Sequence, residues 1–335
     1  MPVPTSNSRP PLRRALSIAV QYSQLKQYEM DLVGTHNDPR ILSDLLVDVF
    51  KYKREDITIL MDDENNDYPW PTRENIEKAM KELVADAQPG DHFVFHFSGH
   101  GALVRNTDGT ERSGYDEVIW PVDIRYENDD GVDNYIMDDE IHDVLVNHIP
   151  VGAHFMMVFD CCHSGSAADL PNTSEDCQPP TPVSAASSTM SLPSSEAVKN
   201  IRVRGTQEIS AATADDAPQR STSKDVFHPA APLADIPVKA IPEVADVTSW
   251  AACEDDQVTF GSSKGGIFVN ALARALRRRP TETHAELLSS VTREISKITA
   301  HINLHKSASE ALPVPKPELE SLESMNEIYN KPLDL

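Results

Sequence analysis

The chain has little positive charge and no long hydrophobic run. It contains 30 Lys and Arg residues against 53 Asp and Glu, a net charge of −23 over 335 residues. This shortage argues against nucleic-acid binding, because phosphate contacts need basic patches. No apolar stretch approaches the roughly 18 residues of a membrane span, and Arg13 and Arg14 precede only a brief apolar run. We therefore expect a soluble protein that binds neither nucleic acid nor membrane.

Cysteine is also scarce. The four cysteines do not make a disulfide framework in a chain of this length, and two of them are adjacent: Cys161, Cys162, Cys177 and Cys253. A reducing compartment is the simpler interpretation, so we expect a cytoplasmic protein, with the nucleus as a second location. Cys177 is expected in a loop and Cys253 in the core.

The hydrophobic periodicity predicts an α/β fold. Continuous apolar runs at residues 92–97 and 155–159 are typical of parallel strands buried on both faces. Residues 16–20 and 56–61 indicate two more strands, and the segments after each have apolar residues at helical spacing. We expect a mostly parallel central sheet with helices on both faces.

Two motifs place reactive side chains where buried strands end. His100 follows one apolar run and Cys162 follows another, which is where an α/β sheet keeps its chemistry. If the strands are neighbours, the imidazole activates the thiol as a nucleophile and shuttles protons. The backbone N–H groups of Gly101 and Cys162 are candidates for an oxyanion hole. A lone buried Cys or a lone His is more often structural, so the pairing carries this interpretation.

These motifs resemble those of the metacaspases, and the fungal type I members most closely. The resemblance rests on SGHG at 98–101, GYDEVIWPVD at 114–123 and DCCHSG at 160–165. It implies a caspase-like fold, with a long disordered loop insert, and a cysteine endopeptidase with a thioester intermediate. It also implies that Cys162 is the nucleophile and that Cys161 occupies the motif's variable position. The short N-terminus departs from the family, whose members often carry a long prodomain.

Charge near the nucleophile predicts the substrate class. A carboxylate beside Cys162 attracts a guanidinium or ammonium and repels acidic side chains. The resemblance implies cleavage after Arg or Lys, with an S1 pocket that includes Asp38, Ser98 and Asp160. Thr35 stands where the family usually has Cys, which leaves the ratio of Arg to Lys cleavage open. For Asp38, a carboxylate at a helix N-terminus is an alternative role that does not exclude the first.

Clustered acidic residues raise the question of calcium. Hard oxygen ligands suit Ca²⁺, but an exposed acidic face is the commoner explanation of such clusters, and no EF-hand is present. The resemblance implies activation by Ca²⁺ through four aspartates, all present here: Asp116, Asp138, Asp139 and Asp169.

A change in composition divides the chain. From residue 171 to about 245, Pro, Ser, Thr and Ala are abundant and periodicity is lost, which indicates a flexible linker. We expect a short flexible N-terminus at 1–14, a large part at 15–170 and a small part at 246–335 of the same domain. The resemblance implies a monomer that cuts itself in the linker. Its basic residues are the candidate sites, against a passive linker as the alternative: Lys199, Arg202, Arg204, Arg220 and Lys224.

Two other functions stay open at this point. One is a non-catalytic caspase-fold scaffold that binds partners through its acidic surface, and the other is a Cys/His hydrolase of different specificity. An enzyme specific for Asp would need arginines in its pocket, where this chain places Asp38 and Asp160. A role in proteolysis during stress responses or cell death is implied by the resemblance alone.

Overall fold

A central sheet organises the protein. The computed structural model describes residues 9–65, 67–106, 115–127, 131–162, 164–165, 167–174, 201–203, 244–254, 257, 259–304, 306–307 and 310–335. Within these residues the central sheet has seven strands: β1 (Arg13–Ala19), β2 (Ile57–Met61), β3 (His92–Ser98), β9 (His154–Asp160), β10 (Asn172–Thr173), β12 (Asp246–Ala251) and β15 (Glu318–Ser321).

The strand order is β10-β15-β12-β9-β3-β1-β2. The five strands from β12 to β2 are parallel, and β15 and β10 add antiparallel pairs at one edge. The predicted mostly parallel sheet is therefore confirmed, with a mixed edge that periodicity alone did not indicate. Parallel neighbours bring their carboxyl ends to the same side, which decides where the functional residues meet.

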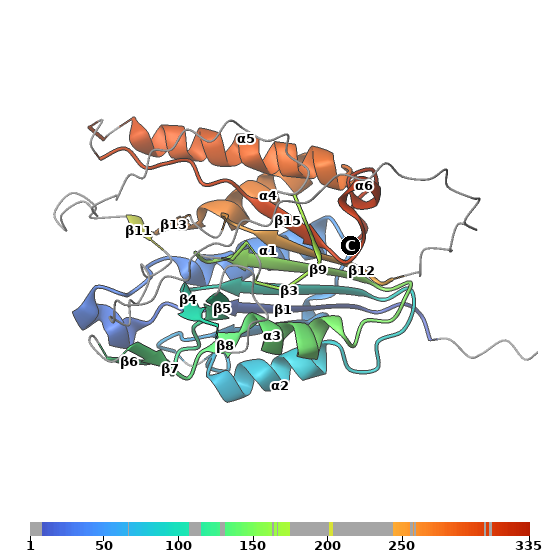
Figure 1. Cartoon of the computed structure of the whole chain (residues 1–335), viewed down its shortest axis with the longest axis horizontal. Coiled ribbons are helices and arrows are strands. Elements are labelled where there is room, and N and C mark those ends of the chain that lie inside the picture. The colour runs from blue at the N-terminus through green and yellow to red at the C-terminus, as the bar shows by residue number, and fades with distance from the viewer. Residues whose placement is uncertain are drawn as a thin grey trace, which may run out of the picture.

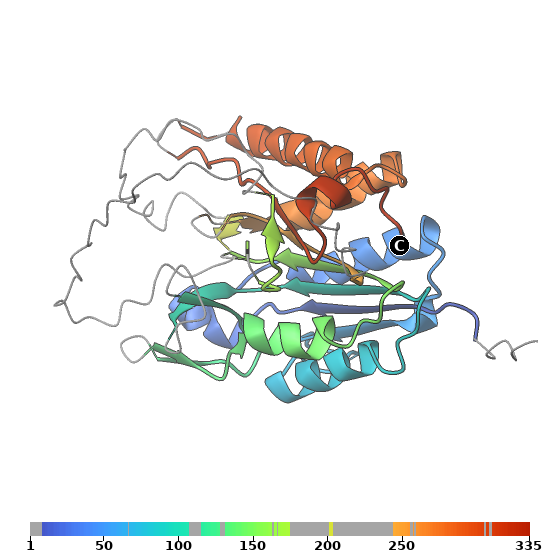
Figure 2. The ribbon, with the colours of Figure 1, turned by 45° about the vertical axis from the view of Figure 1, so that its right-hand side comes forward.

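Helices cover both faces, as predicted. The α-helices are α1 (Asp38–Asp48), α2 (Arg73–Leu83), α3 (Asp138–Ile141), α4 (Ile267–Arg278), α5 (His284–Asn303) and α6 (Met325–Ile328). A π-helical turn, His142–Val146, continues α3, and short 3₁₀ turns lie at Ser23–Tyr28, Thr35–Asn37 and Arg54–Asp56. Figures 1 and 2 show α2 and α3 on one face of the sheet and α4 and α5 on the other.

The alternation of side chains along β3 produces two separate cores. Phe93, Phe95 and Phe97 point to one face and join the α2 side chains Ile76 and Met80 in one cluster. Val94 points to the other face and joins residues of α1, α4 and α5. Both faces of β3 are therefore covered, and all seven of its residues are buried, including the polar His92, His96 and Ser98.

Small sheets gather beyond the carboxyl ends of the central strands (Figure 1). One contains β4 (Gly101–Arg105), β5 (Tyr115–Ile119) and β8 (Ile136–Met137), and another contains β11 (Ile201–Val203), β13 (Phe260–Ser262) and β14 (Gly265–Gly266). A third pairs β6 (Arg125–Glu127) with β7 (Gly131–Asp133).

The range predicted as a linker contributes strands at its start and middle. β10 pairs with β15 at the edge of the central sheet, and β11 pairs with β13. Most of the remaining linker lies outside the described residues, so its predicted flexibility stays a prediction. The longest described helix, α5, has 20 residues, but charged side chains recur along it, and no described helix is apolar enough to cross a bilayer.

Candidate active site

The sheet brings the two motifs side by side. Ser98, the last residue of β3, is the register partner of Asp160, the last residue of β9. His100 and Cys162 each follow two residues later, so both emerge at the same edge of the sheet. A Cβ added to Gly101 would lie 2.2 Å from the Cys162 carbonyl oxygen, so the two turns are packed backbone to backbone. This contact explains why a glycine follows the histidine.

A backbone carbonyl orients the histidine. His100 is buried, and its Nε2 lies 2.7 Å from the carbonyl oxygen of Met30. Because a carbonyl oxygen only accepts hydrogen bonds, Nε2 carries a proton in the neutral ring. Nδ1 is then the nitrogen that takes up and releases a proton. No side-chain motif could reveal this contact, because the acceptor is a backbone oxygen.

Two aromatic residues hold the ring of His100. Its centroid lies 4.8 Å from that of Tyr22 and 5.3 Å from that of Trp120. The Tyr22 hydroxyl donates to the Trp120 carbonyl at 2.6 Å and accepts from the His100 backbone N–H at 3.0 Å. Position 99 has room only for a glycine, because a Cβ there would lie 2.6 Å from that hydroxyl. The sequence analysis missed Tyr22, which is far from either motif.

The adjacent cysteines have different surroundings. The Cys162 Sγ accepts a hydrogen bond from the Thr259 N–H at 3.1 Å and lies 3.7 Å from the Thr259 carbonyl oxygen. Cys161 is buried next to it, and burial raises the pKa of its thiol well above the usual range, with the neighbouring Cys162 as the second cause. The thiolate form of Cys161 is therefore disfavoured. Cys253 is buried as predicted, and Cys177 lies outside the described residues.

The predicted S1 residues are buried around the same strand ends. The Ser98 hydroxyl donates to Asp38 Oδ2 at 2.5 Å, and Ser98 is also the register partner of Asp160. Thr35 lies one turn before Asp38, and its hydroxyl donates to the Leu32 carbonyl at 3.1 Å. Asp38, Ser98 and Asp160 are thus brought together, and all are fully buried.

Both carboxylates also hold the N-terminus of α4. Asp38 Oδ1 accepts from the Gly266 N–H at 2.8 Å, and Asp160 Oδ2 accepts from the Val269 N–H at 2.9 Å. Gly266 is the N-cap of α4 and has no side chain that could cap the helix. Carboxylates satisfy its free N–H groups and favour the positive end of its dipole. With Cys162 also bonded to Thr259, the thiol and both carboxylates are closed off from solvent.

Comparisons with known proteins show the family of this chain. A family model described as "Metacaspase, peptidase C14 domain" matches residues 13–171. Metacaspase-1A of Aspergillus niger is 35% identical over 291 residues, covering 85% of this chain and 67% of the relative. Metacaspase-1 of Emericella nidulans is also 35% identical, with the same coverage. The chain belongs to the metacaspases.

Solved structures show the fold of this metacaspase. Caspase-1 of Spodoptera frugiperda superposes with a TM-score of 0.52 at 13% identity, covering 97% of this chain and 94% of that one. Protein GSU0716 of Geobacter sulfurreducens gives 0.55 at 16% identity, with 96% and 98% covered. The predicted caspase-like fold is confirmed, and the family makes the protein a cysteine-type peptidase.

The four aspartates predicted to bind calcium lie around β5 and α3. Asp116 is on β5 and accepts from Asn106 at 2.5 Å, while Asp138 at the start of α3 accepts from the Glu117 N–H at 2.9 Å. Asp139 follows Asp138, and Asp169 is exposed beside Ala168, whose carbonyl contacts the turn after α3. The donor chemistry fits Ca²⁺. Among the described residues, however, these aspartates do not form a group close enough to share an ion.

The other predictions for this metacaspase fall partly outside the described residues. Arg202 lies on β11, and the other candidate autocleavage residues are not described: Lys199, Arg204, Arg220 and Lys224.

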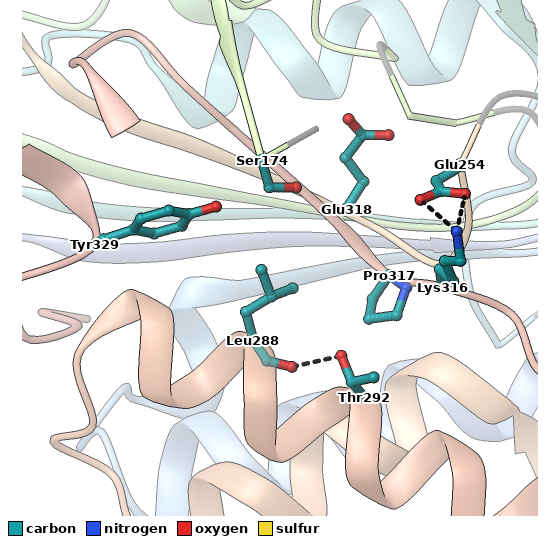
Figure 3. Close-up of a pocket in the computed structure, with 8 residues that line it drawn as sticks. All are labelled: Ser174, Glu254, Leu288, Thr292, Lys316, Pro317, Glu318 and Tyr329. Carbon is teal, nitrogen blue, oxygen red and sulfur yellow. Dashed lines mark hydrogen bonds and ion pairs between the residues drawn. The ribbon is translucent and has the colours of Figure 1, made fainter. Parts of the chain in front are cut away.

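A hollow of about 260 Å³ lies away from the active site, between β15 and α5 (Figure 3). The Lys316–Glu254 ion pair, at 3.2 Å, lies at its rim, and none of the predicted site residues lines it.

Proposed function

We propose that this metacaspase is a calcium-activated endopeptidase that cleaves after Arg or Lys, with Cys162 as nucleophile and His100 as its acid and base. The observation that carries the proposal is the register of β3 and β9, which delivers both residues to one edge of the sheet. The family motif, in which Cys161 occupies the variable position, supports the choice between the adjacent thiols.

The orientation of His100 suggests how the protons move. Nδ1 of His100 takes the proton of the Cys162 thiol, the resulting thiolate attacks the scissile carbonyl carbon, and Nδ1 passes that proton to the leaving amine. Water then hydrolyses the thioester, and Nδ1 accepts a proton from the attacking water. The hydrogen bond from Nε2 to the Met30 carbonyl holds the ring throughout. The N–H groups of Gly101 and Cys162 stabilise the oxyanion.

The acidic pair supplies the specificity. Asp38 and Asp160 are buried carboxylates next to Ser98, and a guanidinium or ammonium that reached them would replace the N–H donors of α4 with a full positive charge. An acidic side chain would place a third negative charge in the same buried space. Thr35 adds a hydroxyl beside this pocket. Because a hydroxyl is neutral, it does not reverse the preference for basic side chains.

The closed site requires activation. Asp116, Asp138, Asp139 and Asp169 would hold the calcium, whose positive charge would neutralise them and tie β5 to α3. β5 pairs along β4 as far as Gly101, through the register pair Gly101 and Ile119. A rearrangement of the β5 strand therefore has a direct route to the turn that carries His100.

Self-cleavage in the linker is the second part of the proposed activation. The candidate sites are those of the sequence analysis, and every one is basic, which matches the proposed pocket: Lys199, Arg202, Arg204, Arg220 and Lys224. We further place this activity in a cytoplasmic or nuclear monomer that acts in stress responses or cell death. These last attributes rest on the family resemblance.

Paired fluorogenic peptides test the proposal. Peptides ending in Arg, Lys and Asp are compared with calcium and with chelator, for the wild type, Cys162→Ala and the matched control Cys161→Ala. We expect cleavage after Arg and Lys by the calcium-loaded wild type and Cys161→Ala only. Full activity in Cys162→Ala would overturn the mechanism, and an unchanged rate in chelator would overturn the calcium dependence. No cleavage by a folded, calcium-loaded wild type would favour the scaffold.

A further inference from the structure

Three residues that the peptidase reaction does not use converge at the opposite end of the sheet. His92 begins β3 and His154 begins β9, and the two are register partners whose rings stack with centroids 4.8 Å apart and an interplanar angle of 14°. The Asp334 carboxylate faces both rings, with its oxygens 3.8 Å from His92 Nδ1 and from His154 Nε2. In Figure 1 the C-terminal end lies beside this end of β9 and β12.

A second carboxylate fixes the orientation of His154. Its Nδ1 lies 3.0 Å from Asp246 Oδ2 at the start of β12, so Nδ1–H donates to that oxygen. The neutral ring then directs the Nε2 lone pair toward Asp334, which is itself an acceptor. A proton on Nε2 satisfies both groups, and a metal ion can take the place of that proton. A carboxylate behind a histidine, with the second nitrogen directed outward, is the usual support of a metal-binding imidazole.

His92 supplies the second lone pair. Its side chain is buried, with 7% of the residue exposed, and its Nδ1 makes no hydrogen bond of ordinary length and angle in the described part of the chain. A buried polar atom without a partner is uncommon and destabilising.

We propose that His92, His154 and Asp334 form a binding site for a divalent transition-metal ion of the zinc type. The three ligand atoms lie within 4.8 Å of one another. Tetrahedral ligands about 2.1 Å from an ion are about 3.4 Å apart, so the stacked rings would have to rotate out of their parallel arrangement to direct both lone pairs at one ion. Two imidazoles and one carboxylate select Zn²⁺, Co²⁺, Ni²⁺ or Cu²⁺ over Ca²⁺.

The bound ion would join three distant parts of the chain. It would tie β3 and β9 to the segment that follows α6, and Asp246 would connect it to β12. β3 rises about 20 Å from His92 to Ser98, so the site is separate from the Cys162 cleft. We expect binding to raise the unfolding temperature and to leave the peptidase pocket unoccupied.

Metal titration of the full chain tests the site. Cys162→Ala is used as the background because it stops self-cleavage and removes the proposed nucleophile as a metal ligand. Co²⁺ binding is followed by its visible spectrum, which separates a nitrogen and oxygen site from thiolate coordination. Zn²⁺ binding is followed by calorimetry and by thermal unfolding in excess Ca²⁺. We expect one equivalent at a nitrogen and oxygen site that Ca²⁺ does not displace.

Matched variants identify the ligands. Asp334→Asn changes an exposed side chain, so it tests the site even if His92→Gln fails to fold. Asp334→Asn and His154→Gln should abolish this equivalent, and Asp246→Asn should weaken binding about 10- to 100-fold. His148→Gln, which alters an exposed histidine, is the control and should bind as the background does. Equal binding by all variants, or no binding by the parent chain, would overturn the proposal. If the parent chain bound no metal, a proton would be the cation that these side chains share. Neither metal-binding result changes the outcome expected in the peptidase assay.

Discussion

Backbone groups complete the active site at the residue scale. The Met30 carbonyl orients His100, the Thr259 N–H covers Cys162, and the Cys162 carbonyl lies where a side chain at position 101 would be. The motifs predicted that His100 and Cys162 would meet, because strand ends are visible in a hydrophobic pattern. They could not predict Met30, Tyr22 or Thr259, because their backbone and tertiary contacts have no signature in the sequence.

Gly101→Ala tests the proposed oxyanion hole. The added Cβ would lie 2.2 Å from a backbone oxygen, so the turn must move and its N–H with it. Loss of one oxyanion donor lowers kcat by about 10²- to 10³-fold. We expect such a fall for Arg peptides with a nearly unchanged KM, in a protein whose circular dichroism matches the wild type. A wild-type kcat would show that this N–H takes no part.

Helix α4 links specificity to stability at the element scale. Its N-terminus bonds to Asp38 and Asp160, and its C-terminus contacts α5 through Arg278 and Glu294. The sequence analysis weighed Asp38 as a carboxylate at the start of its own helix. It did not foresee that both acids hold a helix more than 100 residues later, because that contact depends on the order of strands in the sheet.

Asp160→Asn should lower both specificity and stability. The amide keeps the shape but loses the charge that favours the α4 N-terminus and that, in the proposed function, attracts a basic side chain. We expect kcat/KM for Arg peptides to fall at least about 10-fold, and the free energy of unfolding to fall by about 1 kcal/mol. Thr283→Ala, which removes the cap of α5, is the control. Thr283→Ala should lower the free energy of unfolding by a similar amount and leave kcat/KM unchanged. If its kcat/KM fell as far as that of Asp160→Asn, the charge argument would be refuted.

Glu294 gives the α4–α5 contact a pH dependence. Hydrogen bonds from Lys297 and then Arg278 outweigh the effect of burial and hold the pKa of this carboxyl below its usual range. Its stabilisation is therefore complete above the unfolded pKa, about 4.3, and is lost as pH falls through the lower folded pKa. Both cations are about half exposed, so we expect Glu294→Gln to cost about 1 kcal/mol at pH 7. Urea unfolding should show this difference shrinking below pH 4, whereas a constant difference would contradict it.

A closed, acidic peptidase emerges at the scale of the whole molecule. Alternating strands and helices predicted the parallel sheet and its two covered faces, because each pattern reflects burial within a single element. The antiparallel edge formed by β15 and β10 was not predicted, since short strands at an edge have weak patterns. Closure of the site was also not predicted, because it depends on the segment between β12 and α4 folding back over Cys162.

Calcium should loosen that segment. The N–H groups of Thr259, Gly266 and Val269 bond to the Cys162 thiol and the two acids, so opening the site must break these bonds. We expect faster hydrogen exchange in peptides spanning residues 259–269 when calcium is added to Cys162→Ala, with α5 peptides as the internal control. Exchange that is unchanged or slower in this segment would contradict opening by this route.

Covalent labelling tests the central claim most directly. The calcium-loaded wild type is treated with a peptidyl halomethylketone ending in Arg, and the adduct is mapped by mass spectrometry, with an Asp-ending reagent as the matched control. The account predicts one adduct, on Cys162, formed with the Arg reagent and not with the Asp reagent. An adduct on Cys161, or equal labelling by both reagents, would contradict it.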